Sequence, residues 1–214
     1  MTQPLVIGFD TSGSYCGAAL MQGNSCLAAA YEDMAKGQAE RLMPMLQELL
    51  AEAHMSWSDL DAIGVGVGPG NFTGIRLSVS AARGLAIGLG IPAIGVTLLD
   101  ALAYETTGPV LACLDARRGK GYFQRFGYGD ETAFLGNVDS INDKQAGLKC
   151  IGTLGAEMAD HLDAEHAPSV YAPGSAIARI ARDRLGQVNA RPKPFYLREA
   201  DAAPSKETPP AIIA

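Results

Sequence analysis

The sequence predicts an α/β protein with two lobes of related design, and two features predict this class. An apolar strand ends in Asp10 and turns through glycine into a second strand, and the same pattern recurs at Asp115. Between these two copies, residues 64–92 have the pattern of a strand, a glycine-rich turn, a helix and a stop. Strands that alternate with helices in this way are typical of α/β folds.

The first hundred residues begin with a predicted β-meander over Leu5–Phe9, Gly17–Met21 and Ser25–Tyr31. A helix is predicted from Gln38 to His54, because apolar residues recur there at the spacing of one helical face. These residues are Leu42, Met45, Leu46, Leu49 and Leu50. The spacing favours a helix packed on the core, and a partner surface is the alternative for so wide a stripe.

The turn Pro69-Gly70-Asn71 joins the central strand to its helix, and Asn71 or Thr73 is expected to cap that helix. A helix N-terminus behind a glycine-rich turn is a typical anion site. The P-loop pattern needs Lys after the last glycine, however, and this chain has Ile75 there. A tight turn before a packed helix is therefore the favoured interpretation, and a bound phosphate is the alternative. The phosphate-loop-like residues are Asp10, Thr11, Ser12, Gly68, Gly70, Asn71, Thr73 and Gly74.

The helix after this turn has a side of small residues, because Ser80, Gly84 and Gly88 recur every four residues. A glycine inside a helix costs roughly 1 kcal/mol relative to alanine. Close approach of another helix or of the sheet would offset that cost. An ordinary buried helix is also compatible with the pattern.

The second half is predicted to start with a short helix over residues 98–105 at the lobe boundary. Strands over Val110–Leu114 and Gly121–Phe126 follow. The last predicted elements are helices over 155–162 and 176–184, with a strand and turn over 170–175 between them. We therefore expect an N-terminal lobe over residues 1–101, a C-terminal lobe over 102–198 and a mobile tail over 199–214.

Arg117, Arg118 and Lys120 form a local basic cluster between the two strands of the second half. Such a cluster suits a phosphate or an acidic partner, and a solvated hairpin tip is the alternative. The chain as a whole has a net charge of −6, which argues against binding nucleic acid on its own. The four cysteines have no CxxC spacing, so we expect reduced thiols and a cytoplasmic location. No run of 18 apolar residues occurs, so no membrane span is expected.

Five motifs occur in one order and together resemble the bacterial TsaB family, also called YeaZ and grouped with glycoprotease-like proteins. They are FDTS at 9–12, ERLMPM at 40–45, GVGPGNFTGIR at 66–76, LDARRG at 114–119 and YLR at 196–198. The resemblance extends to about Arg198, and its third motif is highly specific. It implies the two-lobed fold of the actin, sugar kinase and Hsp70 (ASKHA) superfamily, which is ribonuclease H-like.

The resemblance also implies a function. TsaB proteins take part in making N6-threonylcarbamoyladenosine (t6A) at A37 of tRNAs that read ANN codons. The family member is a non-catalytic scaffold for a catalytic paralogue, TsaD, and a small ATPase, TsaE, joins the complex. Alone it forms a homodimer through its N-terminal lobe, and it meets tRNA only through the complex. No cofactor is implied, and any nucleotide binding is weak or absent.

The catalytic paralogue would hold a metal with an HxxxH helix, and this chain has no HxxxH, so we expect neither a catalytic residue nor a metal site. The hypothesis predicts that two N-terminal helices form the partner interface, and that Leu46→Arg or Ala82→Arg abolishes pairing without harming the fold. The predicted interface residues are Glu40, Leu42, Met43, Met45, Leu46, Leu49, Leu50, Ser78, Ala81, Ala82 and Leu85. The alternative is an active ASKHA-type ATPase or small-molecule kinase that uses Asp10 and Asp115 with the turn over 68–74.

Overall fold

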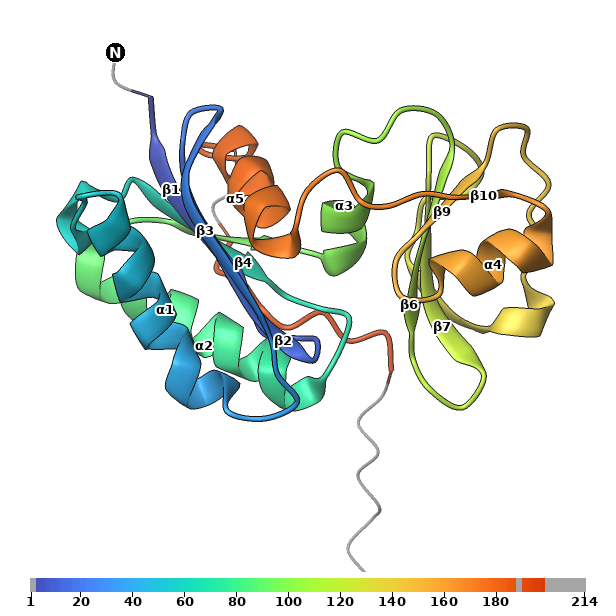
Figure 1. The fold of residues 1–214 in the computed structure, drawn as a ribbon, viewed down its shortest axis with the longest axis horizontal. Coiled ribbons are helices and arrows are strands. Elements are labelled where there is room, and N and C mark those ends of the chain that lie inside the picture. The colour runs from blue at the N-terminus through green and yellow to red at the C-terminus, as the bar shows by residue number, and fades with distance from the viewer. Residues whose placement is uncertain (1–2, 188–189, 199–214) are drawn as a thin grey trace, which may run out of the picture.

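The computed structural model describes residues 3–187 and 190–198, which form two lobes, each built around a five-stranded sheet (Figure 1). The first sheet has the strand order β3-β2-β1-β4-β5. In it β1 pairs antiparallel with β2 and parallel with β4, so the predicted meander and the α/β class are confirmed. Its strands are β1 (Leu5–Asp10), β2 (Tyr15–Gln22), β3 (Ser25–Asp33), β4 (Ala62–Gly66) and β5 (Ala93–Val96).

Helices cover both faces of the first sheet. α1 (Gln38–Glu52) and α2 (Phe72–Leu89) lie on one face, and α5 (Pro173–Asp183) lies on the other (Figure 1). Because both faces are covered, β1 and β4 are buried along their whole length, which explains why they contain so few polar residues.

The position of α5 corrects the predicted boundaries. Residues 170–175 were predicted as a strand and turn, but the helix already starts at Pro173, whose fixed φ suits the first helical turn. The helix contacts β1, β2 and β4 of the first sheet rather than the second sheet. Phe195 also packs on the core of the first lobe. Placing all of 102–198 in one C-terminal lobe is therefore wrong for these two segments.

The contact between α5 and the sheet depends on a close backbone approach. A Cβ atom at Gly8 of β1 would lie 2.5 Å from the Ala178 nitrogen, and one at Gly174 would lie 2.7 Å from the Ala18 Cα. Glycine at positions 8 and 174 thus removes the side chains that would hold the helix away from the sheet.

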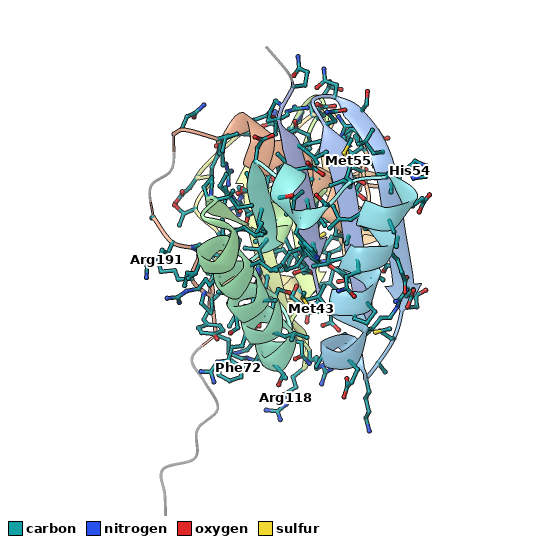
Figure 2. The ribbon with its side chains drawn as sticks, turned by 90° about the vertical axis from the view of Figure 1, so that its left-hand side faces the viewer. Met43, His54, Met55, Phe72, Arg118 and Arg191 are labelled. Carbon is teal, nitrogen blue, oxygen red and sulfur yellow. The ribbon has the colours of Figure 1, made fainter. Side chains whose placement is uncertain are left out.

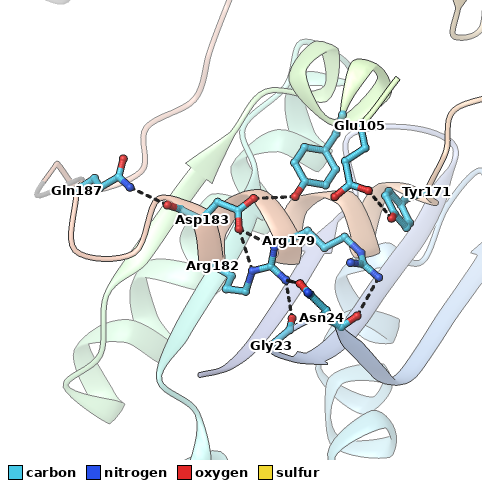
Figure 3. A network of polar contacts seen from close by, with 9 residues as sticks. Gly23, Asn24, Glu105, Tyr171, Arg179, Arg182, Asp183 and Gln187 are labelled. Atoms are coloured by element: carbon cyan, nitrogen blue, oxygen red, sulfur yellow. Dashed lines mark hydrogen bonds and ion pairs between the residues drawn. The ribbon is translucent and has the colours of Figure 1, made fainter. Parts of the chain in front are cut away.

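Polar contacts fix the exposed side of α5 (Figure 3). Arg182 donates to the Gly23 carbonyl in the β2–β3 turn at 2.7 Å, and Arg179 donates to the Asn24 carbonyl at 3.2 Å. At the same C-terminal end of the helix, the Tyr104 hydroxyl donates to Asp183 at 2.7 Å. These contacts tie α5 to the β2–β3 hairpin and to the segment that follows α3 (Leu98–Ala103).

The second sheet has the order β10-β9-β6-β7-β8 and packs against α4 (Gly155–Leu162). The strands predicted around residues 110–126 are confirmed. β8 was not predicted, because four residues that include Gly136 give no clear alternation. The strands are β6 (Val110–Asp115), β7 (Lys120–Phe126), β8 (Phe134–Asn137), β9 (Lys149–Ile151) and β10 (Glu165–His166), with short 3-10 turns at Trp57–Asp59 and Val138–Ser140. The predicted tail over 199–214 lies outside the described residues.

Candidate functional site

The loop after β1 lies against the first turn of α2. The Thr11 hydroxyl donates to the Gly74 carbonyl at 2.8 Å, and the Ser78 hydroxyl accepts from the Thr11 backbone nitrogen at 3.0 Å. The Asn71 backbone nitrogen donates to the Ser12 carbonyl at 2.7 Å. Six predicted phosphate-loop-like residues therefore come together at one place, namely Asp10, Thr11, Ser12, Gly70, Asn71 and Gly74.

The start of α2 is capped by its own sequence. The Asn71 side chain accepts from the backbone nitrogens of Thr73 at 2.9 Å and Gly74 at 3.1 Å. Of the two predicted capping residues, Asn71 is therefore the one that caps the helix, and Thr73 is not. These two N–H groups belong to the set that an anion at a helix start would use, and both already have partners within the chain.

Asp10 occupies the centre of this loop and is fully buried. Its Oδ2 atom accepts from the Ser12 backbone nitrogen at 3.1 Å, from the Ser12 hydroxyl at 2.9 Å and from the Tyr15 hydroxyl at 2.5 Å. Its Oδ1 atom has no hydrogen-bond partner among the described residues. Asp10 caps the turn in the way expected of a structural residue. Tyr15 was missed by sequence reasoning, because nothing in the chain pattern signals that a tyrosine after the turn reaches back to Asp10.

Burial raises the pKa of the Asp10 carboxyl above its ordinary value, and hydrogen bonds from Tyr15 and Ser12 only partly oppose this. The folded state therefore binds the proton more tightly than the unfolded state. The stability that this group contributes is present at low pH and is lost as the pH rises through the folded pKa.

Asp10→Asn is expected to remove this pH dependence, because the amide does not titrate. The unfolding free energy of the variant, relative to that of the natural chain, should rise as the pH goes from about 4 to about 8. Urea unfolding at both ends of that range measures the change. Asp115→Asn, at the end of β6 where the carboxyl is exposed, is the control. A relative stability of Asp10→Asn that is equal at both pH values would contradict the prediction.

The predicted interface residues on α1 and α2 fall into two groups. Seven of them are buried in the chain's own core, so they form no surface in this structure, and listing them as contact residues was wrong. They are Leu42, Met45, Leu46, Leu49, Leu50, Ser78 and Ala82. Ala81 and Leu85 are half-buried, while Glu40 and Met43 are exposed. The α1 members of this group are buried because the apolar face of α1 packs against the first sheet.

The outward side of α2 is made of small residues. A Cβ atom at Gly84 or at Gly88 would meet nothing within 4 Å, and Ser80 is exposed on the same helix. Ile87 is 73% exposed beside them. Figure 2 shows Met43 of α1 at the junction of α1 and α2. The small residues were expected to allow close approach of either another helix or the sheet. The sheet does not approach Gly84 or Gly88, so of these two only another helix remains.

A hollow of about 320 Å³ continues this surface past the C-terminal half of α2. It is lined by Arg83 and Ile87 of the helix, by the chain around Ile91, and by Arg191 from the last described segment. Within residues 3–187 and 190–198, no group of three or more His, Cys, Asp or Glu residues is placed to hold a metal ion. None of the described helices is long and apolar enough to cross a membrane.

Comparison with known proteins assigns the chain to a family. The fold, with one sheet in each lobe and a strand–Asp–hairpin in each, is that of the actin, sugar kinase and Hsp70 superfamily. A family model described as TsaD, tRNA N6-adenosine threonylcarbamoyltransferase, matches residues 32–202. The chain belongs to this family, and within it to the TsaB (YeaZ) proteins.

Individual relatives agree with this assignment. The tRNA threonylcarbamoyladenosine biosynthesis protein TsaB of Escherichia coli is 30% identical over 155 residues, 67% of each chain. YeaZ from Pseudomonas aeruginosa, a solved structure, is 25% identical with a TM-score of 0.75, and the match covers 91% of this chain and 100% of that one. An uncharacterised Mycobacterium leprae protein is 39% identical over 128 residues, which cover 59% of this chain but 36% of that longer relative.

Proposed function

We propose that this chain is a non-catalytic scaffold subunit in the synthesis of t6A at A37 of tRNAs that read ANN codons. In this role it binds and supports a catalytic, TsaD-like paralogue. The proposal is supported by the family, because relatives in Escherichia coli and Bacillus subtilis are named for threonylcarbamoyladenosine biosynthesis. We further propose a cytoplasmic location, a TsaE-like ATPase as a transient partner, and contact with tRNA only within the complex.

The loop around Asp10 supports a structural role for this region. The donors that would hold a phosphate are bonded to groups of the same chain: Thr11 to Gly74, Ser12 to Asp10, and the first amides of α2 to Asn71. A ligand at this loop would have to displace several buried hydrogen bonds, each worth roughly 1 kcal/mol.

The outward side of α2 is the observation that carries the proposal. Gly84 and Gly88 each cost the helix roughly 1 kcal/mol relative to alanine, and no group of the described chain uses the space they leave. A partner helix gains from that space, because small residues let two backbones approach closely. Ile87 and Met43 add exposed apolar area for the contact, and Glu40 is exposed in the first turn of α1.

Gly84→Leu is expected to block pairing with the TsaD-like protein while leaving the chain folded. The new side chain fills the space needed by the partner, so the dissociation constant should rise by roughly 100-fold or more, which corresponds to about 2.7 kcal/mol. The unfolding free energy should not fall, because leucine is a better helix former than glycine. Size-exclusion chromatography with light scattering, on the mixture of the two proteins, measures the pairing.

Ala156→Leu is the matched control, since it adds the same side chain to an exposed position of a helix in the other lobe. It should leave pairing unchanged. The same instrument tests whether the chain alone is a homodimer through this surface, in which case Gly84→Leu should yield a monomer. Full pairing by Gly84→Leu would refute the assignment of α2 as the contact.

The rival function is an active ATPase or small-molecule kinase that uses Asp10 and Asp115. The rival predicts micromolar ATP binding by calorimetry, and it predicts that Asp10→Asn abolishes that binding. The scaffold proposal predicts no heat of binding at micromolar ATP, for the natural chain and for the variant alike.

A further inference from the structure

The turn between β6 and β7 has an uncommon backbone. Arg117, Arg118 and Gly119 follow one another with φ angles of 64°, 56° and 68°. The turn closes through a hydrogen bond from the Lys120 nitrogen to the Arg117 carbonyl at 3.2 Å, and Asp115 accepts from the Arg117 nitrogen at 2.6 Å. Glycine, asparagine and aspartate adopt such positive φ angles far more readily than arginine does. The chain therefore holds two arginines at positions where turn stability favours other residues.

The side chains of this turn carry unpaired positive charge. Arg117, Arg118 and Lys120 are all exposed, and none makes an ion pair or a side-chain hydrogen bond within the described chain. By contrast, Arg41 and Arg125 are bound to carboxylates at 2.6 Å and 2.8 Å. Three cations without a partner on one short turn concentrate positive charge in a chain with a net charge of −6, and such a concentration of charge attracts phosphate.

An exposed aromatic stack lies at the same end of the molecule. The rings of Phe72 and Tyr196 stack with centroids 5.2 Å apart, and both residues are more than two-fifths exposed. Arg76 lies over the Phe72 ring at 3.9 Å and donates to the Tyr196 hydroxyl at 3.2 Å. Figure 2 shows Phe72 and Arg118 at one end of the molecule. Aromatic faces beside arginines are typical of surfaces that stack unpaired bases.

We propose that the turn of Arg117, Arg118 and Lys120 contacts the phosphate backbone of the RNA substrate when this chain is part of its complex, with the Phe72–Tyr196 stack facing the same RNA. This inference rests on the proposed function, because the net charge of the chain argues against strong RNA binding alone and the partner must supply the rest of the surface. The turn orients the RNA, and it does no chemistry.

RNA explains both features better than an acidic protein or a free nucleotide does. An acidic protein surface would use the arginines but not the exposed stack. A nucleotide held by the loop after β1 would need the donors of Thr11 and Ser12, which are already bonded within the chain. A backbone of regularly spaced phosphates with unpaired bases uses both the cations and the aromatic faces.

The test is binding of a fluorescent, unmodified tRNA transcript to the complex of this chain with its TsaD-like partner, followed by anisotropy. The variant is Arg117→Asn with Arg118→Asn, because asparagine keeps the turn and removes the charge. Its dissociation constant should rise roughly threefold to tenfold, and the slope of log K against log salt should become shallower by about 0.7 for each lost phosphate contact. Its Tm should rise by roughly 2–4 °C because the backbone strain is relieved.

Lys144→Asn is the control, since it removes one exposed charge of the second lobe away from the turn. It should leave the salt slope unchanged. An unchanged slope for the double variant, in a complex that still co-elutes, would overturn this inference while the scaffold function stands. Loss of co-elution would instead show that the turn binds the partner protein and would also overturn it. Failure of the natural chain to form any complex would refute the proposed function itself.

Discussion

Leu46→Arg is expected to unfold the first lobe rather than to disrupt a surface. Leu46 is fully buried between α1 and the sheet, in a cluster that includes Phe9 and Ile63. Arginine there would bury an unpaired charge and overfill the core. We expect a loss of about 4 kcal/mol or more in the free energy of unfolding, which leaves little folded protein. Thermal and urea unfolding followed by circular dichroism measure the loss.

Met43→Arg is the comparison, because Met43 lies on the same helix but is 36% exposed. Its effect on stability should stay within about 0.5 kcal/mol, as for most surface changes. The contrast matters for function, because a loss of pairing in Leu46→Arg would report unfolding and not a lost contact. Native stability in Leu46→Arg would show that α1 packs differently from this structure.

Gly74→Ala and Gly84→Ala should have opposite effects, although both sites lie in α2. A Cβ atom at position 74 would lie 2.0 Å from the Thr11 carbonyl oxygen, which is backbone and has little room to move. We expect Gly74→Ala to destabilise the chain by about 3 kcal/mol. At position 84 a Cβ atom meets nothing, so the better helix propensity of alanine should add about 0.5–1 kcal/mol.

Urea unfolding of both variants under one condition decides this prediction. Equal destabilisation by the two changes would mean that Gly84 is covered and that the outward side of α2 is not free. If neither change lowers the free energy of unfolding, the loop after β1 does not pack closely against the start of α2. Gly84→Ala also serves the pairing experiment, because one methyl group tests how close the partner comes.

Much of the first lobe could be predicted from local pattern. The meander of β1 to β3, the apolar face of α1, the Asn71 cap and the stop of α2 at Gly90 all follow from spacing and turn chemistry within a few residues. The predicted site residues also converge, because Asp10 ends β1, and Asn71 starts the helix that follows the neighbouring parallel strand β4. The hydrogen bond from the Thr11 backbone nitrogen to the Ser78 hydroxyl could not be predicted from the sequence, since the two residues are 67 positions apart.

The sequence by itself determined the α/β class, the order of most helices and strands, and the family, through motifs that are local in the chain. The tertiary structure alone decided which apolar and small residues face inward. Leu46 and Ala82 are covered by the sheet and become core, whereas Gly84 and Gly88 are left open. It also decided that α5, which lies far along the chain from β1, covers the second face of the first sheet. The physical reason is that periodicity gives a helix a face, but only the packing of distant elements determines what covers that face.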